Sequence, residues 1–272
     1  MVDLENIWKE IRVNKRFVVM AGPCVIESED LCLSVGTKVK AICDEIGALY
    51  VFKASFDKAN RTSSKSYRGP GPEEGLEILG RIRETLNVPV VTDVHSEEQA
   101  EQAGEIVDVI QIPAFLCRQT DLVLAAVRTG KIVNVKKGQF LSPHEMGQVV
   151  QKAEIGGGSK IMLTERGTTF GYNNLVADMR SIPTMSKFGY PVIFDATHSV
   201  QQPGAGGDKS GGQSEFAPVL ASAAVAVGAD GVFIETHPNP SKALSDGPNM
   251  VPLNEIGDLL KKLMRIREAI NA

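Results

Sequence analysis

The stretch VPVVTDVHSEEQAEQAGEIVDVIQIP (88–113) contains one complete unit of the predicted fold. It opens with the short run Val88–Thr92, whose apolar, β-branched character predicts a strand covered on both faces. Ser96 followed by Gln99 fits a capping box at the start of a helix. A second apolar run, Val107–Ile110, closes the unit. The segment therefore predicts a strand, a helix and a second strand in succession.

The same alternation continues along the whole chain. Helical spacing of apolar residues follows Ser28, a second capping box is found at 142–145, and Gly130 is placed to end a helix in a left-handed conformation. An amphipathic pattern over Leu253–Ile270 predicts a closing helix. The other strand candidates are Phe17–Met20, Leu49–Phe52, Ile132–Val135, Lys160–Leu163, Pro191–Phe194 and Gly231–Ile234.

Eight strand–helix alternations in 272 residues predict an α/β protein with the (β/α)8 TIM-barrel fold, formed by one domain over residues 1–272. A doubly wound open sheet is the alternative. No GxGxxG follows an early strand, which disfavours that alternative. The chain also lacks a linker or a shift in composition that would divide it into two domains.

Composition excludes several classes of protein. A hydrophobic content of 43% with 23% charged residues is typical of a globular protein, and a net charge of −4 argues against a nucleic-acid binder. The four cysteines, at positions 24, 32, 43 and 117, lack the spacing of a disulfide framework or a zinc module. No apolar run reaches the length of a membrane span, and the first residues do not resemble a signal peptide. We expect a soluble, cytoplasmic protein.

Polar residues stand at the end of every predicted strand, where a barrel places its chemistry. Many of them are cationic, and an acidic protein that gathers cations at one mouth is expected to bind phosphate or carboxylate there. The alternative for any one of them is a solvated charge. Lys53 and Lys136 directly follow buried strands and are the strongest candidates. The full set is Lys53, Lys58, Arg61, Arg118, Lys136, Lys137 and Arg166.

A second set at the strand ends comprises Cys24, His198, Glu235 and Asp246. A thiolate, an imidazole and two carboxylates can bind a divalent ion of intermediate softness such as Zn²⁺, Fe²⁺ or Mn²⁺. Spacing alone does not distinguish this site from a core cysteine and a structural histidine. The glycine-rich segment 203–212 lacks the order of a nucleotide-binding loop and predicts a lid over substrate, with a phosphate nest or an idle loop as alternatives.

Seven motifs together resemble the 3-deoxy-D-manno-octulosonate 8-phosphate synthase family over nearly the whole chain. Their order along the chain is preserved, and as a group they are highly specific. They are FKASFDKANRTS (52–63), QIPAFLCRQTDL (111–122), NVKKGQF (134–140), LTERGTTFGYNN (163–174), FDATHS (194–199), ETHP (235–238) and LSDGP (244–248).

This resemblance implies a (β/α)8 homotetramer that condenses phosphoenolpyruvate with arabinose 5-phosphate and water. The products are 3-deoxy-D-manno-octulosonate 8-phosphate, a precursor of lipopolysaccharide, and inorganic phosphate. The family has a metal-dependent branch with cysteine after the first strand and a metal-independent branch with asparagine there. Cys24, in AGPC (21–24), resembles the metal-dependent branch, and His198, Glu235 and Asp246 match the other ligands.

The resemblance also assigns the substrate contacts. It places Lys53, Lys58, Lys136 and Arg166 around phosphoenolpyruvate, with Gln111 and Arg118 nearby. Asn60, Arg61 and Thr62 match the segment that holds the sugar phosphate and serves a neighbouring subunit's site. Asp93 and Ser55 match groups of the sugar cavity. We expect the catalytic groups to be Lys58 as a proton donor, Lys136 at the leaving phosphate, and His198 with Asp246 at the metal.

The segment KANRTSSK (58–65) leaves a second sugar open. Its Arg61-Thr62-Ser63 is also similar to the sister family, 3-deoxy-D-arabino-heptulosonate 7-phosphate synthase, which takes erythrose 4-phosphate. Ala59-Asn60, in place of a single proline, favours the five-carbon sugar. Two alternatives come from other classes, namely a metal-dependent aldolase that releases no phosphate and a non-catalytic sugar-phosphate sensor.

Overall fold

The computed structural model describes residues 2–59, 66–204 and 211–272. Eight parallel strands pair in the order β1-β2-β3-β4-β5-β6-β9-β12, and β12 pairs with β1, so that the sheet closes on itself. The predicted barrel is confirmed, and the open-sheet alternative is wrong because an open sheet leaves its outer strands unpaired. The barrel strands are β1 (Val18–Gly22), β2 (Leu49–Lys53), β3 (Val90–Asp93), β4 (Val109–Ile112), β5 (Ile132–Lys136), β6 (Ile161–Glu165), β9 (Val192–Asp195) and β12 (Gly231–His237).

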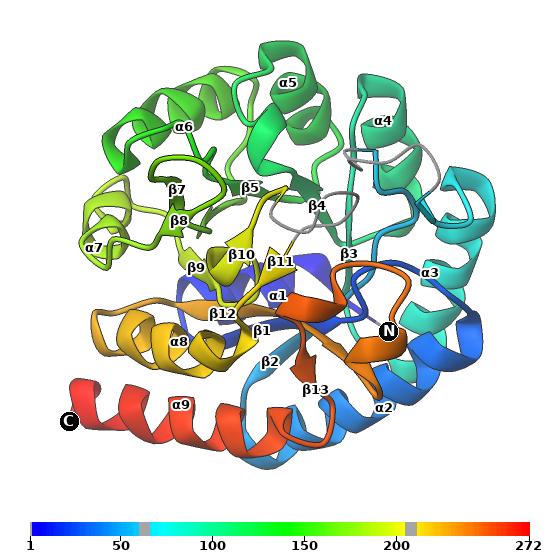
Figure 1. Ribbon diagram of the computed structural model, residues 1–272. Helices are drawn as coiled ribbons and strands as arrows, with labels where there is room; N and C mark the ends of the chain where they lie inside the picture. The colour runs from blue at the N-terminus through cyan, green and yellow to red at the C-terminus, as the bar shows by residue number, and fades with distance from the viewer. Residues whose placement is uncertain (1, 60–65, 205–210) are drawn as a thin grey trace.

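Helices surround the barrel (Figure 1). Among the described residues, no helix is long and apolar enough to cross a membrane. The last helix packs beside the first helix of the ring, which brings the two ends of the barrel sequence together. The helices are α1 (Leu4–Arg12), α2 (Glu29–Ile46), α3 (Pro72–Leu86), α4 (Glu97–Ile106), α5 (Thr120–Arg128), α6 (Met146–Ile155), α7 (Ser181–Ser186), α8 (Ala217–Ala226) and α9 (Ile256–Asn271).

Two apolar clusters make up the core. Because successive strand residues point to opposite faces, Val18 and Met20 face the inside of the barrel whereas Val19 faces the helices. The inner cluster includes Ile7 and Ile11 of α1, so this helix packs against the interior of the barrel. The outer cluster joins the strands to the surrounding helices.

The predicted helix starts are confirmed in outline. The Ser28 side chain caps α2, and the Ser96 side chain accepts a hydrogen bond from Gln99 N at the start of α4. The Gln99 side chain, however, accepts from the backbone of His95 and so does not complete a box with Ser96. The box at 142–145 is present, and it opens a short 3₁₀ turn ahead of α6.

Most barrel strands extend beyond the apolar runs that predicted them. β2 ends at Lys53, β3 at Asp93 and β5 at Lys136, and β12 continues to His237. In a closed parallel barrel, the backbone hydrogen bonds between strands continue past the last apolar residue. The polar residues at the carboxyl ends of the strands can face the open mouth and still belong to the strand. The closing helix is also shorter than predicted and begins at Ile256.

Short strands lie in the loops at this open end of the barrel. After β6, the strands β7 (Thr168–Thr169) and β8 (Leu175–Val176) pair antiparallel. After β9, β10 (Gln201–Gln202) pairs with β11 (Gly211–Gly212), and β13 (Val251–Pro252) adds to the end of β12. All of them follow the carboxyl ends of barrel strands, so they build the walls around the predicted site.

Candidate active site

One cavity lies at the carboxyl ends of the barrel strands. Eight of the predicted site residues line it, although they come from seven barrel strands and the loops that follow them. The parallel barrel brings them together because every strand delivers its last residue to the same rim. These residues are Lys53, Lys58, Asp93, Gln111, Lys136, Arg166, His198 and Asp246.

The other predicted residues lie elsewhere. Cys24 and Glu235 are buried beside the cavity, and Ser55 is buried in contact with the Asp93 carboxylate. Arg118 is exposed and is not among the residues that line the cavity, so the structure does not bring it to the site. Asn60, Arg61 and Thr62 lie outside the described residues, as does segment 205–210 of the predicted lid.

Lys137 differs from its neighbour Lys136. Its side chain is fully buried, with Nζ 3.0 Å from Thr168 Oγ1 and 3.2 Å from the backbone oxygen of Leu141. Nζ also lies 3.6 Å from Glu165 Oε1. Burial lowers the pKa of Lys137. Lys137 therefore links the segments after β5 and β6 through its hydrogen bonds, and it does not line the cavity.

Glu235 anchors the lysines on one side of the site. Its Oε1 accepts a hydrogen bond of 2.9 Å from Lys53 Nζ and lies 3.7 Å from Lys58 Nζ. Burial alone would raise the pKa of Glu235, but the Lys53 ammonium and its cationic neighbours outweigh burial and hold that pKa far below its ordinary value. Glu235 is thus a carboxylate, and its charge fixes two ammonium groups at the cavity.

Asp195 has the same role on the other side. Its Oδ2 lies 2.6 Å from Lys136 Nζ and 2.8 Å from His198 Nδ1. Burial would raise the pKa of Asp195, but His198 and Lys136 hold it well below its ordinary range, whereas burial lowers the pKa of Lys136. A carboxylate on Nδ1 directs the other ring nitrogen, Nε2, toward Glu235, whose Oε2 is 3.6 Å away.

Cys24, Glu235 and Asp246 form a candidate metal centre. One potential ligand atom from each of the three lies within 4.8 Å of the other two, and His198 Nε2 faces the Glu235 carboxylate. Burial, followed by the Glu235 charge, raises the pKa of the Cys24 thiol. Among the described residues, Glu235 Oε2 is buried with no hydrogen-bond partner. A divalent cation fits this set, since it would satisfy that oxygen and favour the thiolate.

Arg166 is part of the wall of the same cavity. It is buried, and its Nη2 donates a hydrogen bond of 3.0 Å to Gln201 Oε1. Its Nη1 is buried and has no hydrogen-bond partner among the described residues. Because a guanidinium has donors in a planar fork, this side chain can still bind an anionic oxygen in the cavity.

Two residues of the site were missed or undervalued by sequence reasoning. Asp195 stands at a strand end like the predicted residues, yet its role becomes visible only through its contacts with Lys136 and His198. His95, which the strand-end pattern does not single out, lines the cavity, has its Nε2 3.5 Å from Asp93 Oδ2 and stacks on Phe115. Its position two residues after a strand-end aspartate was the available signal.

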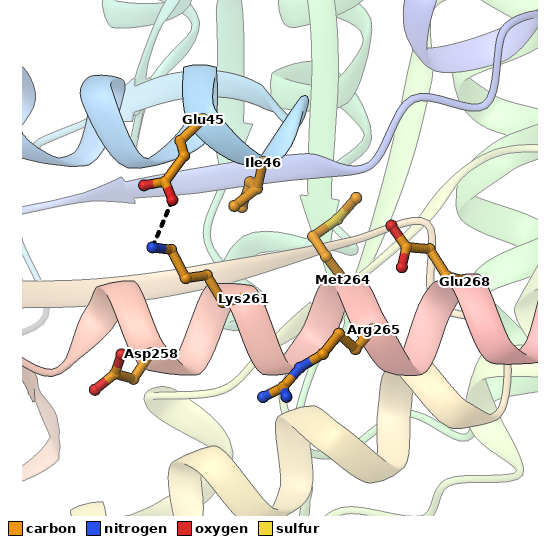
Figure 2. A pocket seen from close by; sticks show the side chains of 7 residues that line it. All are labelled: Glu45, Ile46, Asp258, Lys261, Met264, Arg265 and Glu268. Atoms are coloured by element: carbon orange, nitrogen blue, oxygen red, sulfur yellow. Dashed lines mark ion pairs between the residues drawn. The ribbon is translucent and has the colours of Figure 1, made fainter.

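A second hollow lies between α2 and α9, where α2 ends just ahead of the amino end of β2 (Figure 2). Its charged side chains project from helix surfaces, and Lys261 Nζ pairs with Glu45 Oε1 at 2.6 Å. Surface pairs of this kind are typical of neighbouring helices and contribute little. The barrel mouth, with its buried charges, is therefore the better candidate for chemistry.

The fold and the site define the class of protein: a closed parallel barrel with cationic side chains at its mouth and a set of side chains suited to a divalent ion. Comparison with known proteins shows the family. The chain belongs to the DAHP synthetase I family, whose profile matches residues 9–272.

Individual relatives are similar along nearly their whole length. The chain is 59% identical over 254 residues to the 2-dehydro-3-deoxyphosphooctonate aldolase of Cyanothece sp., with 93% of each chain covered. It is 58% identical over 249 residues to the protein of the same name from Trichlorobacter lovleyi, with 92% of each covered. A third relative of that name, from Desulfosudis oleivorans, is 58% identical over 253 residues, which cover 93% of this chain and 91% of the relative.

Proposed function

We propose that this chain condenses phosphoenolpyruvate with D-arabinose 5-phosphate and water to give 3-deoxy-D-manno-octulosonate 8-phosphate and inorganic phosphate. The observation that carries the proposal is the cavity in which Lys53, Lys58, Lys136 and Arg166 meet at one barrel mouth. Relatives at 56–59% identity bear the name of this activity, which favours it over the heptulosonate alternative. Both substrates are anions, as such a cavity requires.

The reaction forms a carbon–carbon bond and a new carbon–oxygen bond to water at C2, and it breaks the C2–O bond to phosphate. C3 of phosphoenolpyruvate attacks the aldehyde carbon of the sugar, and water adds at C2. The C2–O bond to phosphate then breaks. Negative charge develops on the former aldehyde oxygen and on the leaving phosphate, so preorganised cations and proton donors lower the barrier.

The described residues can supply these functions. Lys136 and Arg166 bind and neutralise the phosphate of phosphoenolpyruvate, while Lys53 holds the carboxylate end. Lys58 donates its proton to the alkoxide that forms on the sugar. Holding two anions together in the right orientation can account for roughly 7–11 kcal/mol of the barrier. Asp195 keeps Lys136 and His198 in place throughout.

We propose that Cys24, His198, Glu235 and Asp246 hold a divalent Zn, Fe or Mn ion. The site has four cationic side chains, and their positive charge is balanced by the four carboxylates of Asp93, Asp195, Glu235 and Asp246. Without a further positive charge the mouth is close to neutral, which is a poor match for two phosphorylated substrates. A bound divalent ion supplies that charge and a Lewis acid for a carbonyl oxygen or a water.

The assembly and location are also proposals. From the family resemblance we infer a homotetramer in the cytoplasm, in which Asn60, Arg61 and Thr62 hold the sugar phosphate at a site shared with a neighbouring subunit. The pattern Ala59-Asn60 supports arabinose 5-phosphate as the sugar.

The test measures inorganic phosphate released from phosphoenolpyruvate with arabinose 5-phosphate or erythrose 4-phosphate, with and without a chelator. We expect release with the five-carbon sugar, its loss with chelator and its return with a divalent ion. Preference for erythrose 4-phosphate would show that the chain is a 3-deoxy-D-arabino-heptulosonate 7-phosphate synthase instead. Condensation without phosphate release would identify an aldolase, and binding without turnover a sensor.

Elemental analysis of the purified protein tests the metal proposal separately. We expect about one divalent ion per chain in the purified protein and in Cys32→Ser, which removes a buried thiol of α2 that belongs to the outer core cluster and not to the candidate ligand set. Cys24→Ser should lose most of the ion. Full metal content in Cys24→Ser, or chelator-resistant turnover by a metal-free wild type, would contradict the metal proposal and leave the reaction intact.

A further inference from the structure

A single aromatic ring lies beneath three groups of the active site. Phe233 is fully buried in β12, and its ring centroid lies 3.5 Å from Lys136 Nζ and 5.4 Å from Lys53 Nζ. The His198 ring is tilted against it at a centroid distance of 5.8 Å. The same ring therefore contacts two cations proposed to bind phosphoenolpyruvate and one proposed metal ligand.

The position of Phe233 is unusual within the barrel. Its side chain belongs to the inner core cluster, in which none of the other buried residues that the structure describes is aromatic. An aliphatic side chain would be equally apolar at this position. The ring differs from it in one property that matters beneath a cation, namely the negative potential over its face.

The lysines have few other sources of attraction. Lys136 Nζ bonds to Asp195, whose same oxygen also holds His198, and Lys53 Nζ bonds to Glu235 and to the backbone oxygen of Cys24. Another carboxylate would hold the ammonium groups but cancel the charge that an anionic substrate must find. A ring face attracts a desolvated cation without adding a negative charge.

We propose that Phe233 is a positioning residue, which holds Lys136 and, more weakly, Lys53 on its ring face and thereby sets the affinity of the cavity for phosphoenolpyruvate. This inference rests on the proposed function. It predicts that affinity follows the electrostatic potential of the ring and not only its volume.

Fluorinated phenylalanines test this directly, because fluorine weakens the negative face of the ring with little change of shape. Mono-, di- and trifluorophenylalanine are placed at position 233, and calorimetry measures the dissociation constant of phosphoenolpyruvate without sugar. We expect a stepwise rise, about tenfold for three fluorines. The thermal midpoint and the KM for arabinose 5-phosphate should stay constant.

Phe194 provides the matched control. It is fully buried in the neighbouring strand, where it pairs with Val232, but it belongs to the outer cluster. The same series at Phe194 should leave the dissociation constant unchanged. Phe233→Leu should behave like the trifluoro variant, since it keeps an apolar side chain but removes the ring.

Two results would overturn the inference: a constant affinity along the 233 series, or equal shifts at positions 233 and 194. The unsubstituted protein separates this outcome from failure of the proposed function. If it binds phosphoenolpyruvate but releases no phosphate with arabinose 5-phosphate, the reaction is wrong while the role of the ring is still measured. If it does not bind phosphoenolpyruvate, both proposals fall.

Discussion

At the scale of single residues, three buried side chains beneath the site form a hydrogen-bond relay. Thr164 Oγ1 donates to Asn134 Oδ1 at 2.7 Å, and Asn134 Nδ2 donates to Gln111 Oε1 at 3.1 Å. Asn134 Nδ2 also faces the sulfur of Met20, which can only accept. The side-chain oxygen of Gln111 therefore accepts a hydrogen bond within the relay, and the NH₂ group of Gln111 is left as a donor for anions in the cavity.

Removing the first donor of the relay should weaken anion binding. Thr164→Val keeps the shape of the side chain but removes the hydroxyl, so Asn134 and Gln111 lose their fixed orientation. We expect the KM for phosphoenolpyruvate to rise about fivefold, which corresponds to one hydrogen bond of about 1 kcal/mol, with little change in kcat. Thr164→Ser retains the donor and should restore the wild-type KM. Equal KM values for the Val and Ser variants would rule out the relay.

At the scale of elements, α1 closes the end of the barrel opposite the mouth. Its N-cap Asp3 accepts from the backbone of Glu5, and Ile7 and Ile11 pack into the inner cluster. In a barrel, the strand N-termini carry stability while the C-termini carry function. This element can therefore be weakened without touching the chemistry.

Ile11→Ala should separate stability from activity. Ile11 is only 1% exposed, and loss of a buried isoleucine side chain costs about 2–5 kcal/mol. We expect urea unfolding to show that loss while both KM values stay within twofold of wild type at 25 °C. Val13→Ala, at a position 68% exposed, is the control and should be nearly neutral. A large change in KM with unchanged stability would contradict this division of roles.

The strands show how far the sequence predicts this molecule. Apolar runs such as Leu49–Phe52 located every barrel strand, because doubly covered strands must be apolar throughout. They stopped short of Lys53 and Asp93, since a polar strand end looks like a loop when its hydrogen-bond ladder is not visible. Partner-dependent roles, such as those of Asp195 and Phe233, depend on which strands become neighbours, and a local pattern does not carry that information.

At the scale of the whole molecule, charge is distributed unevenly. The chain carries a net charge of −4, yet four cationic side chains line one cavity. An acidic exterior favours solubility. Because four carboxylates balance these cations, the proposed divalent ion would supply the excess positive charge that directs anions to this one place. Barrel closure makes this arrangement possible, because residues from distant parts of the sequence share one rim while the helices present the polar surface.

Alkaline pH should destabilise the whole fold through two buried thiols of α2. Burial, followed by nearby carboxylates, raises the pKa of Cys32 and of Cys43 to about 12. The unfolded thiols, with a pKa of about 8.5, lose their protons first. The folded state then binds more protons than the unfolded state, so the free energy of unfolding falls as pH rises from about 8.5 toward 12.

Cys32→Ala isolates one of these thiols. At pH 8 the variant should be less stable than wild type, because a fully buried side chain is shortened. By pH 10 the wild type has lost about 2 kcal/mol through Cys32 alone, a loss that the variant cannot suffer. The stability difference measured by urea unfolding should therefore narrow by that amount between pH 8 and pH 10. Parallel stability curves for the two proteins would show that the folded thiol ionises as readily as the unfolded one.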